Sequence, residues 1–191
     1  MIENSSKLFG DKSTFAISYK PYENSKDIHD VAYCHFILGE HFIGSPDECC
    51  LLGTWTLFVD KFKRHLESNR TNLFNKLFSD LTDREIFEVI MKSNQLESEF
   101  DPMYDYLPVI DNLWGKHCVR LDETQDAYEI VVIEHNEQLK FIWKGWRAPC
   151  PQNEIGKLYN LNVEYDNFLS TIEECLTFLI TTYPDVNIGL K

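Results

Sequence analysis

AYEIVVIEHNEQLKFIWKGWRA, residues 127–148, is the stretch that decides the fold. It contains two runs rich in β-branched and aromatic residues, 127–135 and 139–148, on either side of the short polar turn NEQ. Runs of this kind joined by a tight polar connection are typical of neighbouring antiparallel strands. A third short run, HCVRL at 117–121, comes just before them. Together the three runs predict an antiparallel meander.

The alternation of side chains along the second run separates its two faces. On a strand, Phe141 and Trp143 point to one side and Trp146 to the other. We therefore expect Phe141 and Trp143 in the core. Trp146 and Arg147 lie where Pro149 ends the strand, so they are candidates for an edge cap or for a contact with a partner.

Upstream of this meander, the chain shows further strand signals and then a helix. Residues 14–22 alternate like a half-buried strand, and 31–44 predict a hairpin whose turn lies at Gly39-Glu40. SPDE at 45–48 has capping-box spacing and predicts a helix start. The helix is expected to continue along an apolar stripe made of Trp55, Phe58, Val59, Phe62 and Leu66.

Two more helices complete the pattern. Residues 82–93 open with a capping box formed by Thr82 and Glu85, and 167–183 place their apolar residues on one helical face. The order strands, helices, strands, helix contains no βαβ alternation. It predicts a single α+β domain, residues 1–191, with an antiparallel sheet and helices packed on it.

The charge of the chain is strongly acidic. Eighteen basic residues stand against 31 acidic ones, which gives a net charge of −13. Such a field repels nucleic-acid phosphates and anionic membranes, and it speeds encounter with cationic partners. The six cysteines are scattered without a C-x-x-C, and neither a signal-peptide pattern nor a membrane-length apolar run is present. We expect a cytoplasmic protein with reduced thiols.

Motifs for catalysis, metals and cofactors are missing from the sequence. No P-loop, G-x-S-x-G, H-E-x-x-H or G-x-G-x-x-G occurs, and no spacing matches a zinc site or an EF-hand. On a strand the adjacent His117 and Cys118 would point to opposite faces, so His117 could not activate the thiol. We expect no catalytic residue, metal or cofactor. An enzyme that uses Cys118 or the pair Cys49-Cys50 remains an alternative.

Two acidic segments are candidates for contact with a partner. The segment 97–111 contains no lysine or arginine and interleaves carboxylates with tyrosines, which can pair with basic side chains and also provide stacking area. Another interpretation is a solvated connection with its aromatic rings on the core. The second segment, 122–137, is expected to be a solvated face. The predicted partner-binding residues are Glu97, Glu99, Asp101, Tyr104, Asp105, Tyr106, Asp111, Trp146 and Arg147.

Part of the chain resembles a known family. LFGDKSTFAISYK at 8–20, HFILGEHFIG at 35–44 and the helix after them are similar in order and spacing to the immunity protein 42 group. The resemblance implies an α+β immunity protein of a bacterial polymorphic toxin system, encoded next to the toxin that it neutralises by binding. Trp55 and Trp146 are both candidates for the tryptophan characteristic of that group.

The resemblance and the charge lead to one hypothesis about function. The chain would bind a cognate protein toxin, basic in character, and occlude it without catalysing a reaction. No nucleic acid and no membrane is expected as a partner. An acidic mimic of nucleic acid that inhibits a DNA-binding protein is the alternative from the binding class. The cysteine-dependent enzyme is the alternative from the catalytic class.

Overall fold

The computed structural model describes residues 6–22, 31–69 and 73–184, and its strands form two antiparallel sheets. The N-terminal sheet consists of β1 (Lys7–Gly10), β2 (Phe15–Pro21), β3 (Val31–Leu38), β4 (His41–Ile43) and β5 (Cys50–Leu51). The C-terminal sheet consists of β6 (Tyr128–His135), β7 (Gln138–Gly145) and β8 (Leu158–Glu164). The predicted α+β class is confirmed, and the strands divide between two sheets where the sequence suggested one.

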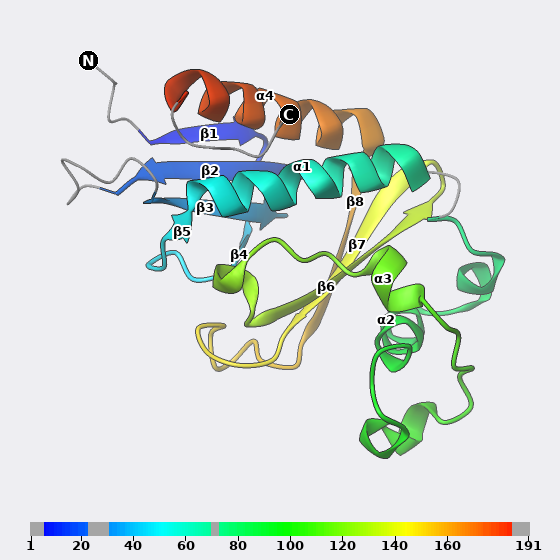
Figure 1. Cartoon of the computed structure of the whole chain (residues 1–191). Coiled ribbons are helices and arrows are strands. Elements are labelled where there is room, and N and C mark those ends of the chain that lie inside the picture. Colours follow the sequence, from blue (N-terminus) through cyan, green and yellow to red (C-terminus); the bar gives the residue numbers. More distant parts are fainter. Residues whose placement is uncertain (1–5, 23–30, 70–72, 185–191) are drawn as a thin grey trace.

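The helices cover the two sheets differently. They are α1 (Leu52–Asn69), α2 (Asp83–Lys92), α3 (Leu113–His117) and α4 (Tyr165–Thr182), with short 3₁₀ turns η2 (Lys76–Asp80), η3 (Glu97–Glu99), η4 (Pro102–Tyr104) and η5 (Glu123–Gln125). Figure 1 shows α1 and α4 running along the N-terminal sheet, while α2 and α3 lie beside the C-terminal sheet. The N-terminal sheet and the pair α1–α4 therefore form one layered unit on which the C-terminal sheet packs.

The hairpin predicted at 31–44 and the pairing of the runs 127–135 and 139–148 are both confirmed. β3 and β4 join at Gly39 and Glu40, which both have positive φ, as a two-residue hairpin turn requires. β6 pairs with β7 so that Ile130 faces Trp143 and Val132 faces Phe141. These pairings establish the meander predicted from residues 127–148.

The predicted third strand of the meander, 117–121, is wrong. His117 ends α3, and the segment makes only an isolated bridge from Cys118 to Val131. The buried His117 ring lies 2.9 Å from the carbonyl oxygen of Val132, which holds the end of α3 beside β6 without a regular strand pairing. The third strand is instead β8, which pairs with the other edge of β7.

The start predicted for the first long helix is also wrong. Residues 45–48 form a turn, and the chain then pairs Cys50 and Leu51 with β3 before α1 begins at Leu52. If the helix began at residue 45, the backbone groups of Cys50 and Leu51 could not form these hydrogen bonds with β3. The stripe on α1 is confirmed except at Phe58, which is 37% exposed. The helix at 82–93 and its capping box are confirmed as α2.

The core joins both sheets and the two long helices. Phe141 and Trp143 are buried as predicted, and they belong to a cluster that also contains Phe168 of α4. Alternate residues of the same strands, such as Val131 and Ile142, are buried in a second cluster under α2. Because the centre of the C-terminal sheet is covered on both faces, residues 130–133 of β6 and 141–143 of β7 are buried one after another instead of alternating with exposed ones.

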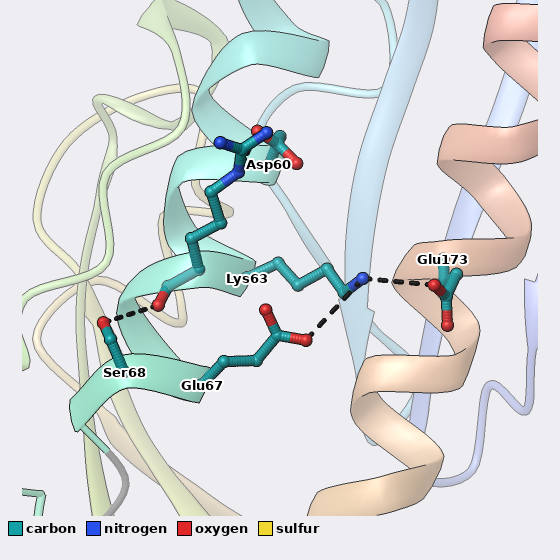
Figure 2. Close-up of polar contacts among 6 residues, drawn as sticks. Asp60, Lys63, Glu67, Ser68 and Glu173 are labelled. Carbon is teal, nitrogen blue, oxygen red and sulfur yellow. Dashed lines mark hydrogen bonds and ion pairs between the residues drawn. The ribbon is translucent and has the colours of Figure 1, made fainter. Parts of the chain in front are cut away.

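Polar contacts between α1 and α4 lie at the surface. Figure 2 shows Lys63 of α1 between Glu67 on its own helix and Glu173 on α4, with Nζ–Oε1 distances of 3.7 and 3.3 Å. Both carboxylates are solvent-exposed, so each pair contributes about 0–1 kcal/mol to stability. The apolar contacts beneath them hold the two helices together.

Candidate partner-binding surfaces

The acidic loop, residues 97–111, leaves α2 and returns to α3 through the turns η3 and η4. Two of its carboxylates shape the loop: Glu99 accepts a hydrogen bond from the amide of Leu96, and Asp101 accepts one from the amide of Met103, both at 3.0 Å. Its acidic side chains are all exposed to solvent. The loop therefore presents a cluster of negative charge on a backbone with defined turns.

The tyrosines of the acidic loop have different environments. Tyr104 is half-buried against the cluster under α2, whereas Tyr106 is 65% exposed. Their ring centroids lie 6.5 Å apart. The hydroxyl of Tyr106 donates a hydrogen bond to Glu85 in the capping box of α2. One tyrosine thus anchors the loop, and the other offers its ring to solvent.

Lys92, at the end of α2, is a buried lysine that fixes the acidic loop. Its Nζ donates a 2.6 Å hydrogen bond to the carbonyl of Tyr104 and lies 4.8 Å from the ring centroid of Phe100. The side chain is only 3% exposed, so these contacts replace its hydration. A single cation therefore connects the loop to the rigid helix.

We expect Lys92→Met to loosen the loop while leaving the rest of the fold intact. Losing a charged hydrogen bond costs about 1.5 kcal/mol locally, so amide exchange at Leu107 should accelerate roughly tenfold. Hydrogen–deuterium exchange followed by NMR measures this directly. Lys116→Met, at an exposed position on α3, serves as the matched control. Unchanged exchange at Leu107 in the Lys92 variant would contradict the anchoring role.

The capping box of α2 gives a stability difference that depends on pH. Hydrogen bonds from Thr82, and then from Tyr106, lower the pKa of Glu85 from 4.5 to about 2. Because the folded-state pKa is lowered, its stabilising contribution is complete above pH 4.5 and is lost as the pH falls toward 2. We expect wild type to have a higher free energy of unfolding than Glu85→Gln at neutral pH. This difference should disappear as the pH falls from 4.5 to about 2. Thermal melts at several pH values test this; parallel curves would refute it.

A cleft of about 1210 Å³ lies elsewhere on the molecule. Its walls come from residues 49–58, from the end of α2 and from Trp114 of α3, from the segment 118–129, and from Trp146 and Arg147 just after β7. No residue of the acidic loop lines it. The structure therefore divides the predicted site residues into two groups, seven on the loop and two at the cleft.

The cleft is predominantly acidic. Among its lining residues, two arginines accompany four carboxylates, namely Asp122, Glu123, Asp126 and Glu129. Arg147 lies 3.7 Å from Asp126 and 4.5 Å from the ring centroid of Trp146. Glu129 is paired with Lys144 at 3.2 Å. Part of the second acidic segment, expected as a solvated face, thus lines a concave surface.

Several residues of the cleft were not predicted as site residues, among them Phe58, Trp114 and Arg120. For Phe58 a signal existed, because the other four stripe residues already follow three- and four-residue spacing and leave it off the buried face. Arg120 lies 5.2 Å from the ring centroid of Trp114. No local sequence pattern marks Trp114 or Arg120 as part of a site. Arg120 lies in the run 117–121, which the sequence predicts to be a strand.

The histidines and cysteines considered for catalysis make structural contacts. His117 faces a backbone carbonyl, and His35 does the same, with Nε2 2.7 Å from the carbonyl oxygen of Ser45. Burial raises the pKa of the Cys118 thiol to about 12, so it is protonated at neutral pH. The Cys50 thiol donates to the carbonyl of Ala32 at 3.3 Å. Across residues 6–22, 31–69 and 73–184, no group of three His, Cys, Asp or Glu side chains could hold a metal.

An acidic α+β protein with an exposed carboxylate loop and an open cleft has the features of a protein that acts by binding. The chain belongs to the immunity protein 42 family, whose model matches residues 1–178, so the resemblance seen in the sequence is confirmed. It is an immunity protein, which neutralises a toxin. In the part of the chain that the structure describes, no helix is long and apolar enough to span a bilayer.

A solved structure has a similar fold. The crystal structure of CdiI from Burkholderia dolosa AUO158 matches with a TM-score of 0.60, covering 90% of this chain and 99% of that chain. The sequence identity is 15%, so the similarity concerns the fold alone. No curated protein sequence matches the chain.

Proposed function

We propose that this immunity protein neutralises a basic cognate toxin by occluding it, without chemistry of its own. The observation that supports this most is the acidic loop: an exposed set of carboxylates, free of basic residues and held on α2 by Lys92. A net charge of −13 attracts a cationic protein and accelerates encounter. Toxin domains that act on nucleic acid are commonly basic, and they would match this field.

The proposed contact residues form two groups that engage the toxin separately. Trp146 and Arg147 make the smaller group at the rim of the cleft, where both side chains are about half-exposed. The larger group on the acidic loop consists of Glu97, Glu99, Asp101, Tyr104, Asp105, Tyr106 and Asp111. Exposed aromatic and arginine side chains supply most of the binding energy in protein interfaces, while exposed charges supply rate and specificity.

The distribution of charge favours a toxin inhibitor over a nucleic-acid mimic. A mimic requires a long row of carboxylates at phosphate-like spacing. Here the carboxylates of the acidic loop and those of the cleft lie on different segments, and Arg120 and Arg147 interrupt the group in the cleft. We further propose that residues 1–191 act as one unit in the cytoplasm, without a cofactor. The six cysteines are free thiols, as a reducing compartment would keep them.

Co-expression with the protein encoded immediately upstream tests the proposal. We expect the chain to restore growth to cells that produce the toxin domain of that neighbour, and to co-purify with it as a complex. A catalytically inactivated toxin domain provides the binding partner for quantitative work. Growth arrest in the presence of the chain, together with no complex, would refute the proposed function.

A further inference from the structure

The cleft contains a carboxylate that lacks a cationic partner. Asp122 is partly buried, and its Oδ1 accepts hydrogen bonds from the amide and the hydroxyl of Thr124, at 3.1 and 2.6 Å. Among residues 6–22, 31–69 and 73–184, Asp122 forms no ion pair and its Oδ2 accepts no hydrogen bond. His35 acts on it electrostatically, but burial lowers the pKa of His35, so it is neutral at neutral pH. Burial raises the pKa of Asp122, as expected for a desolvated acid without a counter-charge.

Gln125, three residues further on, gives a second and independent sign of a ligand. It lines the same cleft and is only 5% exposed. Both its Oε1 and its Nε2 are buried without a hydrogen-bond partner among the described residues. Buried amides are nearly always hydrogen-bonded, because an unpaired one destabilises the fold. In the free chain, the amide of this cleft-lining residue therefore has hydrogen-bonding capacity that no described residue uses.

The walls of the cleft suit a flat cation. Phe58 and Trp146 line the cleft beside the carboxylates and are 37% and 48% exposed. One cation of the chain already lies over each ring: Lys61 Nζ is 5.5 Å from the ring centroid of Phe58 and Arg147 Cζ is 4.5 Å from that of Trp146. The chain already uses this chemistry on itself, since Arg147 stacks on Trp146 while pairing with Asp126. A guanidinium group combines planar stacking with bidentate hydrogen bonding, which an ammonium group cannot do.

We infer that the cleft receives an arginine side chain from the toxin, whose guanidinium pairs with Oδ2 of Asp122 and with Oε1 of Gln125. The inference rests on the proposed function and adds the partner's chemistry to it. The amide of Gln125 turns toward the cleft when the arginine enters. Arginine supplies the counter-charge that Asp122 lacks and an N–H donor for Oε1 of Gln125.

Two near-isosteric variants test the site with the inactivated toxin domain of the upstream protein. Asp122→Asn keeps an acceptor for Thr124 and removes the charge; we expect Kd to rise about 10- to 100-fold, mainly through faster dissociation. Gln125→Met should raise Kd about tenfold while the melting temperature stays equal or rises, because the free protein gives the amide no partner. Glu137→Gln, an exposed residue of the β6–β7 turn, is the control for charge.

The outcomes separate this inference from the proposed function. If wild type binds the toxin domain and both variants bind equally well, the cleft site is overturned and the proposed function stands. A lower melting temperature for Gln125→Met with unchanged Kd would show a purely structural role and also overturn the site. If wild type forms no complex, both fail together. If the site is correct, replacing one particular toxin arginine by lysine should raise Kd for the wild-type immunity protein as much as Asp122→Asn does. The same toxin change should raise Kd much less when the immunity protein already carries Asp122→Asn.

Discussion

Replacing Phe168 by alanine is expected to lower the free energy of unfolding by about 3–5 kcal/mol. Phe168 lies on α4 and is completely buried. Its ring centroid is 4.3 Å from that of Phe15 in the N-terminal sheet and 5.2 Å from that of Phe141 in the C-terminal sheet. It also contacts Phe62 of α1, at 5.9 Å. One side chain thus connects both sheets and both long helices.

The size of this effect follows from how little the cavity can collapse. Its walls include rings from three other elements, β2, β7 and α1, each held by its own strand pairing or helix, so truncation leaves empty volume. The loss is a large share of the roughly 5–15 kcal/mol that stabilises a typical domain. Urea unfolding followed by tryptophan fluorescence measures it. Phe74→Ala, at a position 53% exposed, should change stability by less than about 0.5 kcal/mol. Similar values for the two variants would contradict this account of the core.

The elements that carry Phe168 and Phe141 were predictable because each has a regular local pattern. On α4 the apolar residues recur at helical spacing, and those on the predicted face are buried. On β7 the alternation of the strand correctly assigned Phe141 and Trp143 to the core. Such patterns report burial directly, since a helix or strand presents the same face to the core along its whole length.

Other parts of the structure could not be predicted, because long-range contacts decide them. The strand β8, LYNLNVE, contains two exposed asparagines and one fully buried residue, Val163, so its sequence does not stand out as a strand before β7 pairs with it. No local sequence pattern indicates that the strands divide into two sheets. The cleft brings Phe58 together with Asp122 and Trp146, which are far apart in the chain. Only tertiary packing assembles such a site.

A second large effect is expected when the acidic loop loses its charge. The triple variant Asp101→Asn, Asp105→Lys and Asp111→Lys should slow association with the inactivated toxin domain by about 10- to 100-fold. Asparagine is chosen at 101 because the side chain there accepts the hydrogen bond from Met103 and must keep an acceptor. The other two carboxylates are exposed, so lysine is accommodated without strain. Stopped-flow mixing measures the association rate.

Salt and kinetics distinguish this loop from the cleft. The difference between wild type and the triple variant should shrink as salt rises from about 0.05 to about 0.5 M, because long-range attraction is screened, while dissociation changes little. The control carries the same change in net charge on α4, with Asp166→Asn, Glu173→Lys and Glu174→Lys, at the far end of the molecule from the loop (Figure 1). An equal slowing in this control would mean that overall charge, rather than the loop, guides the toxin. If the loop acts as proposed, its variant changes association and Asp122→Asn changes dissociation, so combining them should multiply the two effects on Kd.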